Sequence, residues 1–256
     1  MPRVLACLAV VFLAAAVDGQ EEKEPECRIR FLAVGNSPPF RQEIRDGVRY
    51  ELPPPPGSIP PRRLRLEREV SDGEMEEFGN VTLKLGSVSN SVTFSASGDR
   101  PIRLREEGAA DPWVSIPFPG EGSFLVILRR DSRARTWDEV KCSLISDLLP
   151  EGSLRFINAS ERTLAVVLGE ERIALRAGRT WDTRLAAGRA AGFQLGMPDG
   201  TGGLDRVLNR SIEQGRNEKS LVVISEADRP DARSPLKVTV IREAARKQLP
   251  PGGGTD

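Results

Sequence analysis

The 256-residue chain has no histidine, one tyrosine, three tryptophans and three cysteines. Without imidazole, the chain has no serine–histidine or cysteine–histidine nucleophile, no histidine zinc site and no histidine proton shuttle. Its 37 basic residues balance 37 acidic ones, and the two signs are interspersed. No overall charge therefore attracts nucleic acid or an anionic membrane. We expect no metal, no cofactor, no nucleic-acid partner and no enzymatic activity.

The remaining routes to catalysis have weak support. Carboxylates such as Asp138 and Asp182 are abundant, but no spacing marks two of them as an acid and a base. The segment PDGTGGLD, residues 198–205, resembles a calcium loop only through Asp199 and Asp205, and a glycine-rich turn explains it as well. An enzyme that uses paired carboxylates or calcium is therefore the least favoured alternative.

The amino-terminal sequence MPRVLACLAVVFLAAAVDGQ combines a basic residue, an apolar run and small residues. This pattern predicts a secretory signal peptide at residues 1–19 and a secreted or periplasmic protein. No later apolar run is long enough to span a membrane, so we expect no transmembrane segment after signal removal. Cys27 and Cys142 then remain, either as one disulfide or as two thiols.

Most of the remaining chain consists of short runs rich in valine, isoleucine, leucine and phenylalanine, separated by glycine, proline, aspartate and asparagine. SFLVILRR at residues 123–130 is typical, and such runs predict β-strands. The exception is GLDRVLNRSIEQG, residues 203–215, whose apolar spacing predicts one short helix. The residues at that spacing are Leu204, Val207, Leu208 and Ile212.

Three segments recur in the same order along the chain, which indicates an internal repeat. The pairs are RFLAVGNS from Arg30 with RFINAS from Arg155, LKLG from Leu83 with VVLG from Val166, and SFLVILRRD from Ser123 with SLVVISEAD from Ser220. A second alignment pairs Phe78 with Phe156 and leaves residues 27–79 as a preamble.

Short strands in two similar halves predict an all-β fold of two similar antiparallel β-sandwich (Ig-like) domains in tandem. The first domain is expected at residues 27–149, with a proline-rich insertion at 38–79. The second is expected at 150–245, because Pro150 and Gly152 interrupt two apolar runs. Residues 246–256 have the composition of a flexible tail.

The segment SLRFINASERTLAVVLGEERIALRAG, residues 153–178, resembles the opening of small β-sandwich domains in secreted bacterial proteins. Among these are accessory proteins of exopolysaccharide acetylation and surface-protein modules. Paired halves with an early proline-rich insertion also resemble uncharacterised exported bacterial proteins. The resemblance implies a fold and a compartment, and it transfers no catalytic residue to this chain.

The candidate binding residues are aromatic and basic. RTWD occurs twice, at Trp137 and at Trp181, and Trp113 lies among prolines. These rings either contact a partner or fill the cores. Arg63 and Arg65 alternate with leucines, as in a strip for an acidic polymer or in an edge strand protected by charge. We expect the five residues to form a binding surface and not a reaction centre.

These observations favour an exported, non-catalytic binding or structural protein of the cell envelope. Its expected partner is a protein or polysaccharide of that envelope. The alternative is an accessory subunit of a polysaccharide-modifying or export complex.

Overall fold

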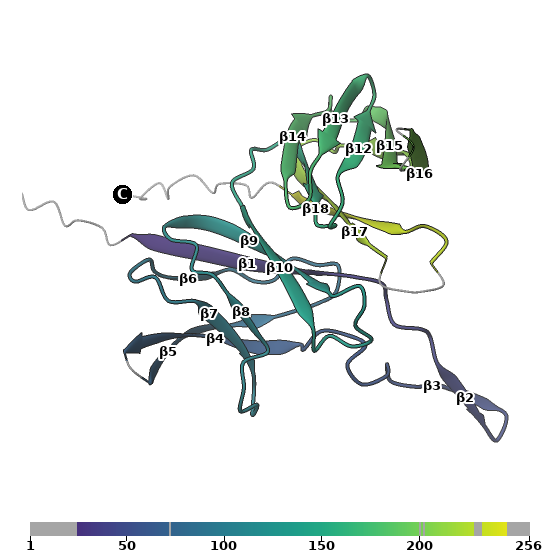
Figure 1. Ribbon diagram of the computed structural model, residues 1–256. Coiled ribbons are helices and arrows are strands. Elements are labelled where there is room, and N and C mark those ends of the chain that lie inside the picture. The colour runs from purple at the N-terminus through teal and green to yellow at the C-terminus, as the bar shows by residue number, and fades with distance from the viewer. Residues whose placement is uncertain (1–24, 72, 200, 202, 228–231, 245–256) are drawn as a thin grey trace, which may run out of the picture.

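The computed structural model describes residues 25–71, 73–199, 201, 203–227 and 232–244. Eighteen β-strands make up the regular structure of these residues (Figure 1), and the predicted all-β class is confirmed. No helix in the described ranges is long and apolar enough to cross a membrane. The predicted signal peptide and the whole of the predicted tail lie outside the described residues.

The first half of the chain forms one sandwich of two four-stranded sheets and a separate hairpin. One sheet has the order β10-β9-β1-β6 and the other the order β5-β4-β7-β8. The strands are β1 (Glu26–Val34), β4 (Arg63–Ser71), β5 (Glu74–Thr82), β6 (Val92–Ser95), β7 (Ile102–Glu106), β8 (Val114–Ile116), β9 (Gly122–Arg130) and β10 (Val140–Ser146). The hairpin consists of β2 (Gln42–Arg45) and β3 (Val48–Glu51).

The second half forms a second sandwich. Its sheets have the orders β14-β11-β17-β18 and β13-β12-β15-β16. The strands are β11 (Ser153–Asn158), β12 (Leu164–Leu168), β13 (Glu171–Leu175), β14 (Thr180–Arg184), β15 (Ala190–Pro198), β16 (Leu204–Glu213), β17 (Glu218–Glu226) and β18 (Leu236–Ala244). When the first of these orders is read in reverse, as β18-β17-β11-β14, each strand of the first half other than β2 and β3 has a counterpart at the same place. The two halves therefore share one topology.

The strand registers identify which residues of the two halves correspond. β1 runs parallel to β9 with Arg30 opposite Leu125, and β11 runs parallel to β17 with Arg155 opposite Leu221. The alignment of Arg30 with Arg155 is therefore correct, and the alternative that begins at Phe78 is wrong because Phe78 lies in edge strand β5. Each half thus contains one parallel pair, so the sheets are not purely antiparallel.

Two details of the sequence repeat differ from these registers. The sequence repeat aligns Ser123 with Ser220, whereas the strand registers align Leu125 with Leu221. The predicted alignment is therefore shifted by one residue. A shift of one residue exchanges the two faces of a strand. The LKLG segment from Leu83 follows β5, whereas VVLG from Val166 ends β12, the counterpart of β4. These two segments are therefore not equivalent.

The proline-rich insertion is shorter than predicted. Residues 35–62 separate β1 from β4, whereas only residues 159–163 separate the corresponding strands β11 and β12. The predicted range of 38–79 thus includes β4 and most of β5, which are strands of the first sandwich.

The predicted helix at 203–215 is wrong, because β16 pairs along its length with β15. A β-bulge explains the misleading pattern: Leu208 lies opposite Leu195 and Arg206 lies opposite Gly196, which leaves Val207 as the extra residue. The bulge lets the adjacent Val207 and Leu208 both pack against the second core. A bulged strand therefore reproduced the spacing of a helix face.

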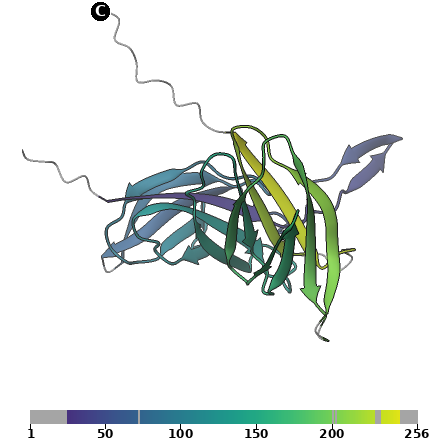
Figure 2. The ribbon, with the colours of Figure 1, turned by 90° about the horizontal axis from the view of Figure 1, so that it is seen from above.

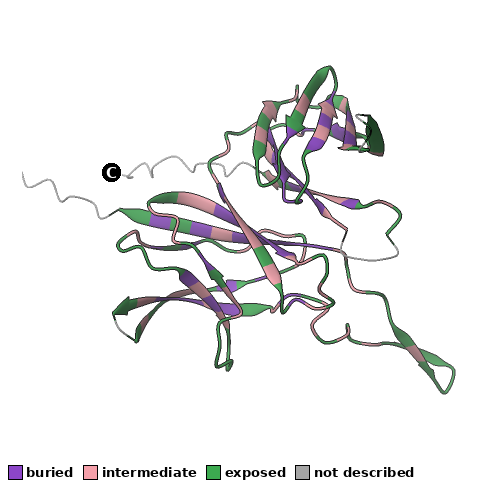
Figure 3. Ribbon diagram, in the orientation of Figure 1, coloured by how far each residue is buried: buried purple, intermediate pink, exposed green. Residues whose placement is uncertain are grey.

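Each sandwich encloses its own apolar core, and a third apolar cluster joins the two sandwiches. Strand β9 shows why its sequence is a continuous apolar run. Val126 and Leu128 face the first core, whereas Leu125 and Ile127 face the third cluster. A strand buried on both faces has no polar alternation. Figure 3 shows this burial along the strands of both sandwiches and the exposure of the β2–β3 hairpin.

Candidate interaction surface

The joint between the sandwiches uses equivalent residues of the two halves. Its apolar cluster contains five residues from each half, and each has its counterpart across the joint. The pairs are Leu32 with Ile157, Val34 with Ala159, Leu125 with Leu221, Ile127 with Val223, and Ile145 with Ile241. A surface that meets its own equivalent is the arrangement of a twofold dimer. The chain therefore resembles such a dimer joined into one polypeptide.

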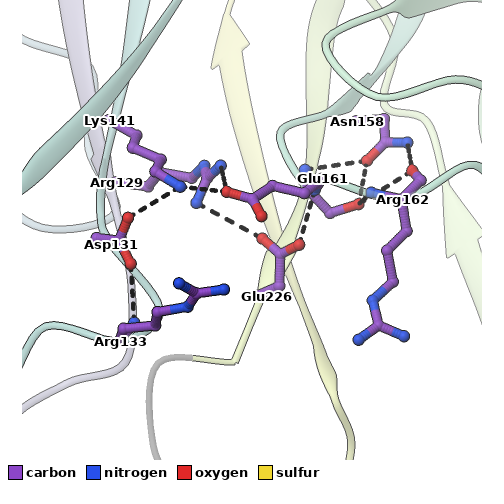
Figure 4. Close-up of polar contacts among 9 residues, drawn as sticks. Arg129, Asp131, Arg133, Lys141, Asn158, Glu161, Arg162 and Glu226 are labelled. Carbon is purple, nitrogen blue, oxygen red and sulfur yellow. Dashed lines mark hydrogen bonds and ion pairs between the residues drawn. The ribbon is translucent and has the colours of Figure 1, made fainter.

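An ion network closes one end of this joint (Figure 4). Arg129 of β9 lies 3.3 Å from Glu161 and 3.6 Å from Glu226, both in the second sandwich. Lys141 pairs with Asp131 at 2.8 Å and also with Glu161. A hydrogen bond from Lys141, and a weaker effect of one from Arg129, hold the pKa of Glu161 below its usual value. These contacts cross from one sandwich to the other and favour one relative orientation.

The same twofold relation between the two halves includes a pair of lysines that bond across the joint. Lys141 lies in β10 and Lys237 at the equivalent place in β18. Lys141 reaches Glu161 just after β11, and Lys237 donates to the carbonyl of Gly35 just after β1. Each lysine therefore bonds to the opposite sandwich at equivalent sites.

Arg30 and Arg155, which are equivalent in the two halves, both bind residues 146–148. These residues end β10 and begin the linker between β10 and β11. Arg30 binds both oxygens of Asp147 at 2.7 Å and also pairs with Glu243 of β18. Arg155 binds Asp182 at 2.6 Å and donates to the carbonyls of Ser146 and Leu148. Burial alone disfavours the charge on Arg30, but its bonds to the two carboxylates outweigh burial and raise its pKa. The linker is thus fixed from both sides.

The tryptophans predicted to bind a partner pack against the cores. Trp137 is 1% exposed, and its backbone N–H donates to the carbonyl of Gly57 at 2.8 Å. Gly57 has a φ of 69°, and a β-carbon there would come within 2.8 Å of the neighbouring Thr136 side chain, so glycine is required for this contact. The prediction that Trp137 contacts a partner is therefore wrong, because its ring is inside the first core.

The other two tryptophans are partly buried. Trp113 packs against the first core and donates its ring N–H to the carbonyl of Trp137 at 2.7 Å. Trp181 lies in β14 and stacks on Phe156, with ring centroids 5.0 Å apart. The two RTWD segments are not equivalent, since Trp137 follows β9 whereas β14 corresponds to β6. The structure therefore does not bring the three rings together on one surface.

A substitution at Trp113 tests its structural role. Trp113→Phe should lower the free energy of unfolding by about 1 kcal/mol, because the ring N–H bond to Trp137 is lost while most of the ring volume remains. Urea denaturation measures this difference, and Tyr50→Phe on the exposed hairpin is the control with no expected loss. An unchanged midpoint in Trp113→Phe would show that the ring does not support the core.

The predicted basic pair, Arg63 and Arg65, lies in β4, an inner strand between β5 and β7. The alternative of a charged edge strand is therefore wrong, although Leu64 and Leu66 alternate into the core as expected. Arg63 is exposed, whereas Arg65 lies 3.5 Å from Glu77. Further pairs on this sheet join Arg105 to Glu67 and Arg103 to Glu69. The sheet therefore carries a balanced set of charges and no basic strip.

The two cysteines are free, and the predicted disulfide is not formed. Cys142 lies opposite Leu128, which lies opposite Ala33, six residues along β1 from Cys27. That offset separates the cysteines by about 20 Å along the sheet, far beyond the reach of a disulfide. Burial raises the pKa of Cys27 to about 11, although the charge of Arg68 opposes this effect.

The β2–β3 hairpin projects away from both sandwiches (Figure 1 and Figure 2). Its side chains include large apolar residues that are exposed to solvent. They are Phe40 at 71%, Ile44 at 62%, Val48 at 52% and Tyr50 at 49% exposure. Four of the eight large hydrophobic residues exposed in the described chain therefore lie within residues 40–50. Such a concentration of exposed apolar side chains is typical of an interaction site.

Turn chemistry and prolines shape this arm. Asp46 and Gly47 have φ angles of 51° and 80°, as a two-residue type I′ hairpin turn requires. The Asp-Gly pair is a strong hairpin signal that sequence reasoning missed, because the surrounding prolines led to the interpretation of the whole region as a proline-rich insertion. Pro38 and Pro39 precede the arm and residues 53–56 after it are all proline, which restricts its two connections to the body.

The described residues contain no group of three or more cysteine, aspartate or glutamate side chains that could hold a metal ion. Asp199, the centre of the faint calcium-loop pattern, accepts bonds from Thr201 and Gly203 in a local turn. No protein-family model matches this chain, and no curated protein matches it either. The function proposed below therefore rests on the chemistry of the described surfaces.

Proposed function

We propose that this chain is an exported, non-catalytic binding protein of the cell envelope, in which two joined sandwiches present the β2–β3 hairpin to a partner protein. The observation that carries the proposal is the concentration of exposed apolar side chains on that projecting hairpin. The amino-terminal signal-like sequence supports export.

The chemistry of the hairpin favours a protein as partner. Arg41, Arg45 and Arg49 are balanced by Glu43, Asp46 and Glu51, so the arm has no charge excess that would select a polyanion. β2 and β3 pair only with each other in the described chain, so each has an outer edge with free backbone groups. Such edges accept an additional strand from another protein.

Both faces of the hairpin carry an apolar side chain. Ile44 lies opposite Arg49 on one face, and Tyr50 lies opposite Glu43 on the other. A partner that clasps the arm contacts both faces, whereas a flat partner contacts one. Separate substitutions at Ile44 and Tyr50 therefore report the mode of binding.

An accessory subunit of a polysaccharide-modifying or export complex is a specific form of the same role. The resemblance of residues 153–178 to accessory proteins of exopolysaccharide acetylation supports it. In that role the arm would hold an enzyme or channel, and the sandwiches would set its distance from other components.

Substitutions on the arm test the proposal. Ile44→Asp and Tyr50→Ala should each reduce partner capture from an envelope extract at least tenfold, because large apolar anchors dominate protein interfaces. Their free energies of unfolding should stay within about 0.5 kcal/mol of the unsubstituted protein, because both side chains are solvent-exposed. Quantitative mass spectrometry of proteins retained on the immobilised chain measures the capture.

Val70→Asp is the matched control, since Val70 is 47% exposed on β4, away from the hairpin. It should leave capture unchanged. If both arm variants retain the same proteins in the same amounts as the unsubstituted chain, the hairpin is not the binding element.

A further inference from the structure

A groove lies at the open side of the second sandwich, between two edge strands. β16 is the last strand of one sheet and β18 the last strand of the other. The hollow between them has a volume of about 400 Å³ and is lined by Arg210, Ser211, Ile212, Val240 and Arg242. It is far from the β2–β3 hairpin in sequence and belongs to the other sandwich.

The two arginines of this groove have no carboxylate partner among the described residues. Arg210 places its guanidinium 5.9 Å from the ring centroid of Phe193, and partial burial lowers its pKa. Arg242 donates only to the backbone carbonyl of Glu213, at 3.2 Å. The groove therefore concentrates two positive charges that no acidic group balances.

The more deeply buried arginines elsewhere in the described chain are paired with carboxylates. Arg30, Arg105, Arg129 and Arg155 each lie within 3.3 Å of a carboxylate. Arg210 and Arg242 are both exposed residues, so a ligand can reach them, and the partial desolvation of the Arg210 guanidinium makes a counter-ion favourable there. An acidic ligand would supply the missing partner.

The floor and rim of the groove point to an extended peptide. Ile212 is 5% exposed and Val240 is partly buried, so they offer an apolar floor between the arginines. Three consecutive residues of β16 line the groove, and no strand of the described chain pairs with the outer edge of β16. An extended chain pairs with such an edge and directs alternate side chains to one face.

A buried polar group next to the groove is also unsatisfied. Ser220 of β17 lies opposite Arg242, so both side chains point to the same face of the sheet. Ser220 is 1% exposed, and its hydroxyl has no hydrogen-bond partner. This end of the second sandwich thus has spare hydrogen-bonding capacity as well as spare positive charge.

We propose that the groove binds an extended acidic segment of a partner protein. Carboxylates of the segment pair with Arg210 and Arg242, an apolar side chain between them packs on Ile212 and Val240, and the main chain follows the edge of β16. No aromatic ring lines the groove to stack on a sugar, so a peptide fits it better than an acidic polysaccharide. This site is independent of the hairpin.

Fluorescence anisotropy with the full chain tests the site. The probe is the fluorescein-labelled peptide Ser-Glu-Ser-Val-Ser-Glu-Ser, whose two glutamates and one valine share a face of an extended chain. The matched probe has glutamine in place of each glutamate. The acidic probe should bind with an affinity that falls as salt is added, and the glutamine probe should bind at least tenfold more weakly. Arg210→Gln and Arg242→Gln should each weaken binding of the acidic probe at least tenfold, the loss typical of one charge-assisted hydrogen bond.

Arg216→Gln is the matched control, because Arg216 lines a neighbouring hollow and not this groove. It should change the affinity less than twofold. Arg210→Lys keeps the charge and should still lose most of the affinity, since lysine lacks the two-pronged guanidinium. Thermal melting checks that each variant is folded.

Three outcomes would overturn the proposal. They are no binding of the acidic probe at millimolar concentration, equal binding of the two probes, and binding of oligogalacturonate in place of the peptide. The hairpin variants Ile44→Asp and Tyr50→Ala should bind the probe normally. A failure of the groove is therefore distinguishable from a failure of the hairpin.

Discussion

Arg30→Met should lower the free energy of unfolding by about 3 kcal/mol, because it removes the cation that bridges two carboxylates that are largely shielded from water. The side chains of Arg30, Asp147 and Glu243 are 15%, 9% and 18% exposed. Methionine fills a similar volume, so the loss reports mainly Asp147, which loses its arginine partner, and Glu243, which keeps only its pair with Lys219 at 3.2 Å. Chemical denaturation at neutral pH measures the loss.

The pH dependence of this variant provides a second measurement. Burial works to raise the pKa of Glu243, but hydrogen bonding and charge from Arg30, with help from Lys219, hold it below the usual value. A lowered folded-state pKa stabilises the protein above the unfolded-state value of about 4.3, and this stability is lost as pH falls below it. In Arg30→Met the part of this contribution that comes from Arg30 is lost while that of Lys219 remains, so stability should fall less between about pH 5 and pH 3 than in the unsubstituted chain.

Two further variants control the result. Arg45→Met removes an ion pair whose members, Arg45 and Glu43, are 65% and 44% exposed, and it should cost less than about 0.5 kcal/mol. Arg30→Lys keeps the charge but loses the two-pronged contact with Asp147. Its loss of free energy of unfolding should lie between those of Arg30→Met and Arg45→Met. Equal stability of Arg30→Met and Arg45→Met would mean that the linker is not held by Arg30.

Val223→Asp should open the joint between the sandwiches. Val223 is fully buried in the third apolar cluster, where a carboxylate would be desolvated without a partner, at a cost of several kcal/mol. Each sandwich has its own core, so separation of the two is a less costly response than unfolding. We expect a larger radius of gyration in small-angle X-ray scattering and two separate transitions in chemical denaturation.

Val70→Asp is again the control, because the same change at a valine that is 47% exposed should leave both measurements unchanged. A Val223→Asp protein with the original radius of gyration and a single, unshifted transition would contradict the role of the third cluster. The equivalent substitution Ile127→Asp should reproduce the opening, since the two residues are counterparts across the joint.

Local patterns in the sequence predicted much of the fold. Alternation in β4 places Leu64 and Leu66 in the core, as the period of a strand requires. The misprediction at β16 arose where a bulge interrupts that period, because Val207 and Leu208 then follow each other on the buried side. Sequence reasoning works where the backbone is regular and fails where one extra residue changes the phase.

The candidate binding residues were predicted less well. Tryptophans are rare enough in this chain to attract attention, but their exposure depends on which strands surround them. Trp137 is buried in the first core and its backbone bonds to Gly57, 80 residues earlier, and no local pattern near either residue indicates that contact. The groove between β16 and β18 was likewise missed, because Arg210 and Arg242 come together only when the two sheets close into a sandwich.

The sequence by itself determined the all-β class, the two similar halves and the alternation of buried and exposed residues along regular strands. These properties depend on neighbouring residues in the chain, and a strand period or a turn pair encodes them directly. The tertiary structure alone decided that the halves meet through equivalent faces, that Arg30 pairs with Glu243 across 213 positions, and that Cys27 and Cys142 stay apart. Strand order and register set such long-range distances, and no short stretch of sequence contains them.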